Sequence, residues 1–313
     1  REGAFLTNNV ILSVFAFVVL LGTLYPVFVE AFSGAQVSVG RPFFDRMAVP
    51  LSFALLLAMG VGPFMPYRRA GGAVMWRRLR IPLLLAAAVS AALVLAGLRE
   101  VAVVLIAFLV TAMVSGTVQE LVRSTPSPRP GPIWRMVTKR RGYWGGQLAH
   151  IGLALVALGI VTSGTLADRA SVSLAVGEST RFDGYTLTYE GNEEVTGGDR
   201  SATIARIVFE AGGDVVYRAE PALTQFNNQV QAVATPSVWS TPTRDIYVAL
   251  SSLEEDRVAI NLYRYPYMWL LWTGGITVMV GGFWALGLGG RARGRGAATQ
   301  AENDRVGEQG ARG

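Results

Sequence analysis

Six stretches of about 20 mostly apolar residues dominate this 313-residue sequence. An α-helix rises ~1.5 Å per residue, so a stretch of that length covers the ~30 Å of hydrocarbon in a bilayer. Backbone polar groups inside a bilayer must be satisfied within the protein, which favours helices. The predicted spans are Asn9–Val29, Met47–Met65, Ile81–Leu98, Val101–Val118, Trp144–Thr165 and Pro266–Leu288. We therefore predict an α-helical multi-pass membrane protein with about six transmembrane helices.

The composition agrees, because 51% of the residues are hydrophobic and only 16% are charged. The absence of cysteine excludes disulfides and thiolate metal sites. The pI near 9.9 does not indicate a nucleic-acid partner, because the basic residues gather in alternate loops. These clusters follow the second, fourth and sixth spans, so the positive-inside rule predicts that both ends face the cytoplasm. No signal peptide is visible before the first span, and we expect the chain to be part of a longer one.

The segment 166–265 differs from the rest, because it carries most of the acidic residues and reads as short strands separated by turns. The predicted strands are Ser171–Val176, Thr180–Glu190, Thr203–Glu210, Val215–Ala219, Asp245–Ser251 and Val258–Tyr263. We expect a β-rich sandwich or barrel on the extracytoplasmic side, either a partner-binding surface or a structural cap. The predicted domains are a membrane domain at 1–165 with about five helices, this β-rich domain at 166–265, a last helix at 266–290 and a disordered cytoplasmic tail at 291–313. The proline-rich segment Ser124–Pro132 is expected to be an extended connector.

His150 is the only histidine, and it lies within the fifth predicted span. An ionisable side chain at membrane depth needs a partner, and neutral imidazole commonly binds a metal or haem iron. Gly146 and Ala154 share its helix face and would let a flat macrocycle approach, although small residues also let another helix pack closely. From the residues alone, His150 can thus be either a ligand or a structural histidine. We take His150 as a candidate metal ligand and His150, Gly146 and Ala154 as candidate cofactor-binding residues. A second strong axial ligand would have to be a methionine or come from another polypeptide.

Glycines on the last span recur in a seven-residue pattern, at Gly274 and Gly275 and again at Gly281 and Gly282. Small residues at this spacing predict a helix face that packs closely against another helix. Acidic groups are nearly absent from the spans, which argues against an ion or proton relay. A catalytic triad built on His150 is also improbable, since this histidine lies in the membrane. Hydrolysis by this chain alone is therefore not expected.

Several motifs, in this order, resemble the C-terminal half of CcmF, a family of bacterial cytochrome c maturation haem lyases. They are Arg1-Glu2-Gly3, Asn8-Asn9, Leu21–Pro26, Ser38–Asp45, Gly60–Pro63, Ala149–Gly152 and Arg244–Leu250. The resemblance implies a role in cytochrome c-type biogenesis, in which haem from the chaperone CcmE is attached to apocytochrome c together with CcmH and CcmI. It also implies a permanent haem b in the membrane, reduced by quinol, with His150 as one of its axial ligands and the second ligand outside this chain.

The tryptophan-rich haem-binding segment of that family is not in this sequence, so the half that attaches haem is absent. The chain is expected to work with the N-terminal half of the same protein or with a separate subunit, surrounded by membrane lipid. Whether it is an enzyme on its own is left open. Two alternatives remain: a b-type, quinol-linked electron-transfer subunit, and a non-catalytic scaffold or transport component in which His150 is simply packed.

Overall fold

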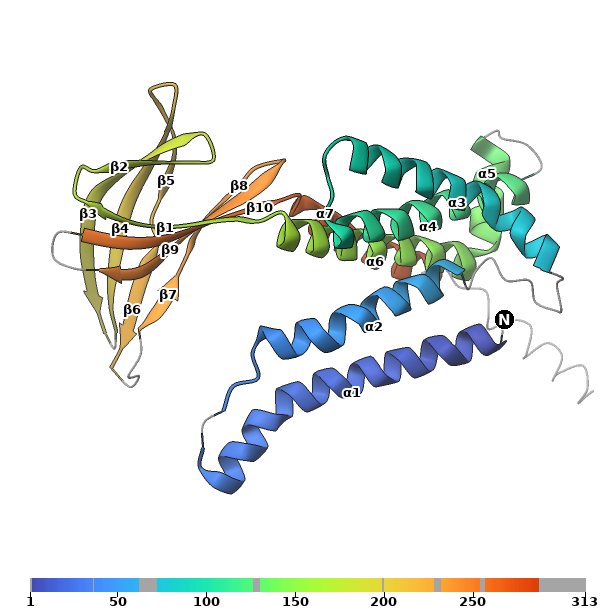
Figure 1. The fold of residues 1–313 in the computed structure, drawn as a ribbon, viewed down its shortest axis with the longest axis horizontal. Coiled ribbons are helices and arrows are strands. Elements are labelled where there is room, and N and C mark those ends of the chain that lie inside the picture. Colours follow the sequence, from blue (N-terminus) through green and yellow to red (C-terminus); the bar gives the residue numbers. More distant parts are fainter. Residues whose placement is uncertain are drawn as a thin grey trace, which may run out of the picture.

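The structure is a computed structural model that describes residues 2–35, 37–61, 72–125, 130–198, 200–227, 232–253 and 257–286. Helices fill one end of the molecule and a β domain forms the other (Figure 1). The six helices that are long and apolar enough to cross a membrane confirm the predicted multi-pass architecture. They are α1 (Glu2–Ser33), α2 (Arg41–Val61), α3 (Gly72–Leu95), α4 (Val101–Ser124), α6 (Arg141–Thr165) and α7 (Trp269–Leu286).

The prediction of an extended connector at Ser124–Pro132 was wrong at both ends. Helix α4 continues to Ser124, and a short helix α5 (Pro130–Lys139) has Pro130 and Pro132 in its first turn. Proline fits the first turn of a helix because the amide hydrogen that it lacks has no intrahelical acceptor there. Aromatic contacts hold α5 in place: the Trp134 ring lies 5.3 Å from that of Trp284 in α7. Residues 126–129 and the predicted disordered tail lie outside the described residues.

Helices α6 and α7 pack backbone to backbone along the predicted glycine face. A Cβ built on Gly281 would lie 2.5 Å from the Ala149 amide nitrogen and 2.7 Å from the Gly145 carbonyl oxygen. A Cβ on Gly274 would likewise lie 2.7 Å from the Gly152 carbonyl oxygen. Gly274 and Gly281 thus meet backbone of α6, and no larger residue fits at either position without moving a helix. The neighbours Gly275 and Gly282 face open space.

The β domain is inserted between α6 and α7, as predicted, and consists of two antiparallel sheets. One has the strand order β1-β10-β9-β8; the other has the order β2-β3-β4-β6-β7, with β5 paired to β4. The strands are β1 (Asp168–Ala175), β2 (Ser179–Phe182), β3 (Tyr185–Gly197), β4 (Arg200–Ala211), β5 (Asp214–Ala219), β6 (Ala222–Phe226), β7 (Val233–Thr235), β8 (Ser237–Ser240), β9 (Arg244–Leu253) and β10 (Arg257–Pro266).

Alternation along the central strands builds the core between the sheets. Leu187 and Phe209 of one sheet and Ile246, Ile260 and Leu262 of the other are fully buried in a single cluster. The predicted strand Thr180–Glu190 is in fact two strands, because Asp183 (φ 51°) and Gly184 (φ 84°) form the turn of a hairpin between β2 and β3. Strands β6, β7 and β8 were not predicted.

The α6–α7 contact predicts different effects for two adjacent glycines. Gly281→Ala places a methyl group against the backbone of α6 and should destabilise the folded membrane domain by ~1–3 kcal/mol, the usual cost of overpacking. Gly282→Ala is the matched control, since its Cβ meets nothing within 4 Å. Denaturant unfolding of both variants in detergent measures the difference, and equal stabilities would contradict the close contact.

Candidate functional site

The position of His150 is set by the contact between α6 and α7. Gly145, Gly152 and Gly159 all face α7. At ~100° per residue, His150 lies about 140° around the helix from Gly145, on a flank that does not touch α7. The glycine contact therefore fixes the helix that carries the imidazole while leaving the imidazole itself clear of α7.

The two sides of that flank differ. Ala154 is only 1% exposed and packs in a cluster with Met59 of α2 and Ile106 of α4. On the other side, a Cβ on Gly146 would meet nothing within 4 Å, and Leu153 is 40% exposed. The half-buried His150 thus stands between a packed helix interface and an open surface. The structure brings Gly146 and His150 to this open side, whereas Ala154 faces the neighbouring helices.

One imidazole nitrogen of His150 lacks a partner. Its Nδ1 atom is buried and makes no hydrogen bond with the described residues. Buried polar atoms are nearly always paired, so an orphaned one calls for a ligand or a further group. A planar macrocycle that approaches over Gly146 is compatible with this arrangement, since it needs one imidazole and a shallow helix surface. Within the described part of the chain, the residues around His150 therefore fit a haem, to which His150 offers an imidazole ligand.

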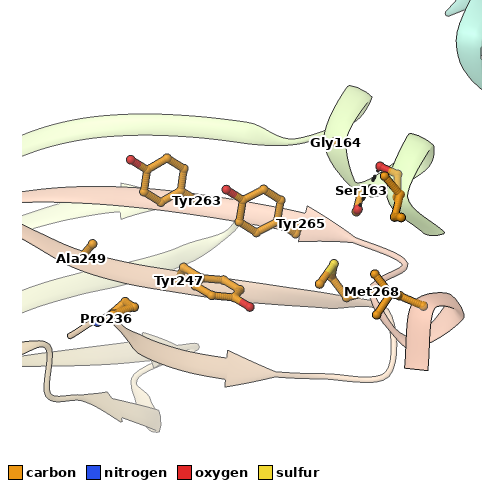
Figure 2. Close-up of a pocket in the computed structure, with 10 residues that line it drawn as sticks. Ser163, Gly164, Pro236, Tyr247, Ala249, Tyr263, Tyr265 and Met268 are labelled. Carbon is orange, nitrogen blue, oxygen red and sulfur yellow. Dashed lines mark hydrogen bonds between the residues drawn. The ribbon is translucent and has the colours of Figure 1, made fainter. Parts of the chain in front are cut away.

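A second feature lies where the β domain joins the helices. A cavity of about 470 Å³ is bounded by Tyr247, Tyr263 and Tyr265 of the strands and by Ile160 and Met268 of the helix ends. In Figure 2 the Tyr263 and Tyr265 rings lie side by side along β10, and the Tyr247 hydroxyl points toward Met268. Burial, together with the nearby Asp245 carboxylate, raises the pKa of Tyr247, so this phenol stays neutral at physiological pH. The cavity is apolar with a few hydroxyl groups.

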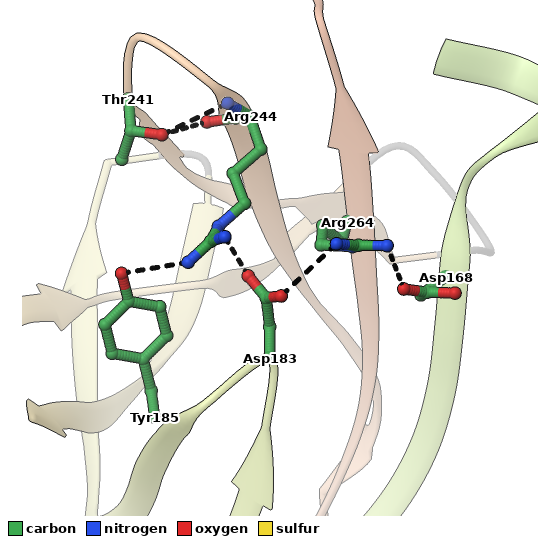
Figure 3. A network of polar contacts seen from close by, with 6 residues as sticks. All are labelled: Asp168, Asp183, Tyr185, Thr241, Arg244 and Arg264. Atoms are coloured by element: carbon green, nitrogen blue, oxygen red, sulfur yellow. Dashed lines mark hydrogen bonds and ion pairs between the residues drawn. The ribbon is translucent and has the colours of Figure 1, made fainter. Parts of the chain in front are cut away.

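A chain of ion pairs ties the two sheets together at the same end of the β domain (Figure 3). Asp183, in the hairpin turn between β2 and β3, pairs with Arg244 Nε at 2.6 Å and with Arg264 at 3.5 Å. Arg264 also pairs with Asp168 at the start of β1, and Arg244 donates to the Tyr185 hydroxyl at 3.2 Å. Asp183 is only 12% exposed, so solvent screens its ion pairs less than it screens surface pairs. The network fixes the start of β9 and the end of β10. Helix α7 begins directly after β10.

Sequence reasoning found neither the tyrosine cavity nor this network. Alternation along β9 and β10 carried a usable signal, because Tyr263 and Tyr265 fall on the face opposite the buried Ile260 and Leu262. Pairing of Asp183 with arginines about 60 and 80 residues away depends on the packing of two sheets, which no local pattern reveals.

The network predicts unequal roles for its two carboxylates. Asp183→Asn keeps a residue that tolerates positive φ but leaves two partly buried arginines without their shared counter-ion. We expect a loss of ~3 kcal/mol in the stability of the β domain. Asp168→Asn is the control, because Asp168 is 62% exposed and should cost at most ~1 kcal/mol. Thermal unfolding followed by circular dichroism separates them, and equal shifts would refute the central role of Asp183.

Comparison with known proteins agrees with this architecture. Residues 165–266 match the family model described as the CcmF C-terminal beta-sandwich. The chain is 32% identical to the cytochrome c-type biogenesis protein CcmF of Pseudomonas fluorescens over 291 residues, which are 91% of this chain and 43% of the relative. It is 31% identical to CcmF of Escherichia coli K12, with the same two shares. The chain thus spans less than half the length of these relatives.

A solved structure gives the same result in three dimensions. The structure titled "Cytochrome c Heme Lyase CcmF" superposes with a TM-score of 0.75 at 25% identity, covering 92% of this chain and 46% of the solved chain. The six spans and the inserted β domain are therefore shared beyond the region of the family model. Over about nine tenths of its length, the chain corresponds to the C-terminal part of CcmF, which confirms the resemblance seen in its sequence motifs.

Proposed function

We propose that this chain contributes His150 as one axial ligand of a haem b within the membrane part of a cytochrome c haem lyase. The observation that carries the proposal is the buried, unpartnered Nδ1 of a half-buried histidine that stands beside an open helix surface. The names of the relatives, which are cytochrome c-type biogenesis proteins and a haem lyase, support the choice of haem over another ligand. The second axial ligand comes from outside this chain.

The chain's own residues hold the imidazole. Helix α6 is held against α7 by glycine contacts and against α4 by the cluster that includes Ala154, so the backbone at His150 has little freedom to rotate. About nine residues separate His150 from Arg141 at the start of α6, which corresponds to ~14 Å of depth. Haem b bound there would supply a one-electron centre inside the membrane. Gly146 leaves the space that a flat group needs beside the ring.

The remaining activity belongs to a larger assembly. Because the chain covers 43% of its relatives, we assign haem attachment itself to the part of the protein that this chain lacks. In this proposal the assembled protein would receive haem from CcmE and act with CcmH and CcmI on apocytochrome c, and the haem b held by His150 would supply one-electron chemistry linked to quinol.

The orientation of the chain follows from its charges. The arginine-rich segments that follow α2, α4 and α7 favour a cytoplasmic location under the positive-inside rule. The β domain connects to the end of α6 and the start of α7, so it would lie on the opposite, periplasmic side of the inner membrane. His150 would then sit in the cytoplasmic half of the bilayer.

Replacement of His150 tests the ligand role. In the complete protein, His150→Ala should abolish or strongly weaken the haem b absorbance in reduced-minus-oxidised spectra, while the amount of membrane-inserted protein stays the same. His150→Gly should recover absorbance when imidazole is added, because the vacated space admits a diffusible ligand. Ile160→Ala, an exposed residue ~15 Å further along the same helix, is the control and should keep its haem. Wild-type haem content in His150→Ala would leave His150 as a merely packed residue.

A further inference from the structure

An apolar groove runs between α3 and α4. It has a volume of about 610 Å³. Ile81 and Leu85 of α3 form one wall, and Val114 and Val118 of α4 form the other. Most of this lining is hydrocarbon, and Val118 is 51% exposed. The groove therefore presents a hydrophobic surface inside the membrane-spanning part of the described chain.

One end of the groove is positively charged. Arg123, which directly follows Val122 near the end of α4, belongs to the lining itself. Helices α3 and α4 are antiparallel neighbours, so Arg77, Arg78 and Arg80 at the start of α3 lie at the same end as Arg123. All four arginines are exposed. Charge thus accumulates at one mouth of an apolar groove.

The position of Arg123 is supported by the neighbouring helix. With its amide oriented to satisfy both atoms, Gln119 donates to the Arg78 carbonyl oxygen at 2.8 Å and accepts from Arg123 at 3.1 Å. Within the described part of the chain, no carboxylate lies within 4.0 Å of Arg123. The nearest acidic residue along α4 is Glu120, whose carboxylate accepts a hydrogen bond from Ser124 instead. Arg123 is therefore held in place without a counter-ion.

The length of the groove matches one leaflet of a bilayer. From Val110 to Arg123 α4 rises ~20 Å, close to half of the hydrocarbon core plus a headgroup layer. An acyl chain fits the valine and leucine walls, and a phosphate fits the arginine end. Basic pockets between transmembrane helices are a recurrent way to hold anionic phospholipids.

We propose that the α3–α4 groove binds an anionic phospholipid, with its acyl chain along Leu85, Val114 and Val118 and its phosphate on Arg123. Charge complementarity selects an anionic headgroup over a zwitterionic one, because among the described residues this mouth carries four arginines and a single carboxylate, Glu120. The lining of this site includes none of His150, Gly146 and Ala154.

Native mass spectrometry of the full-length membrane protein tests the proposal, with dioleoyl phosphatidylglycerol, dioleoyl phosphatidylcholine and inorganic phosphate as probes. We expect phosphatidylglycerol to be retained in preference to phosphatidylcholine, and inorganic phosphate not to displace it. Arg123→Gln should lower phosphatidylglycerol retention about fivefold, and Val118→Trp should lower it by filling the groove. Arg99→Gln, which changes an exposed arginine beyond the other end of α3, is the matched control and should have no effect.

Four results would overturn the proposal. Equal retention of the two lipids would show that the headgroup charge does not matter. Unchanged retention in Arg123→Gln would show that Arg123 does not bind the phosphate. Displacement by millimolar inorganic phosphate would show an anion site without an acyl-chain groove. Failure of Val118→Trp to assemble, with no phosphatidylglycerol preference in the wild type, would show instead that another helix of the full-length protein covers the groove.

Discussion

The backbone contact between α6 and α7 supports both halves of this molecule. Glycines at seven-residue intervals bring the two helices so close that the backbone of one replaces side chains on the other. Because there is no hydrophobic driving force between helices in lipid, such close van der Waals contact is a main source of their association. This one interface orients His150 on the far side of α6 and also sets the spacing of the two chain segments that enter the β domain.

The β domain depends on that spacing. Strand β1 follows α6 and strand β10 precedes α7, and the two strands are antiparallel partners with Asp168 opposite Arg264. The helix pair therefore continues into a strand pair. Asp183 extends the connection to the second sheet through its pairs with Arg244 and Arg264. A movement of α7 against α6 would displace the start of β1 and the end of β10. It would also change the shape of the tyrosine cavity where the β domain joins the helices.

Much of this fold could be predicted because its signals are local. Apolar length predicted the six spans, and the glycine pattern of the last span predicted its close contact with another helix. Pro130 and Pro132 led to the wrong prediction of an extended connector, since proline is compatible with both an extended segment and the first turn of a helix. The position of Ala154 could not be predicted: helical periodicity places it near His150 but does not say which side α2 and α4 occupy. The ion pairs that Asp183 makes between the two sheets could not be predicted either, because they depend on how the sheets pack.

The central claim is that this chain supplies one of two axial ligands to a haem held between it and the rest of the protein. Reduced-minus-oxidised spectra of three samples test it most directly: this chain alone, the remainder of the protein alone, and the two produced together. The account predicts a low-spin b-type spectrum with two strong axial ligands only in the combined sample. The same spectrum from the remainder alone, or no haem in the combined sample, would contradict it.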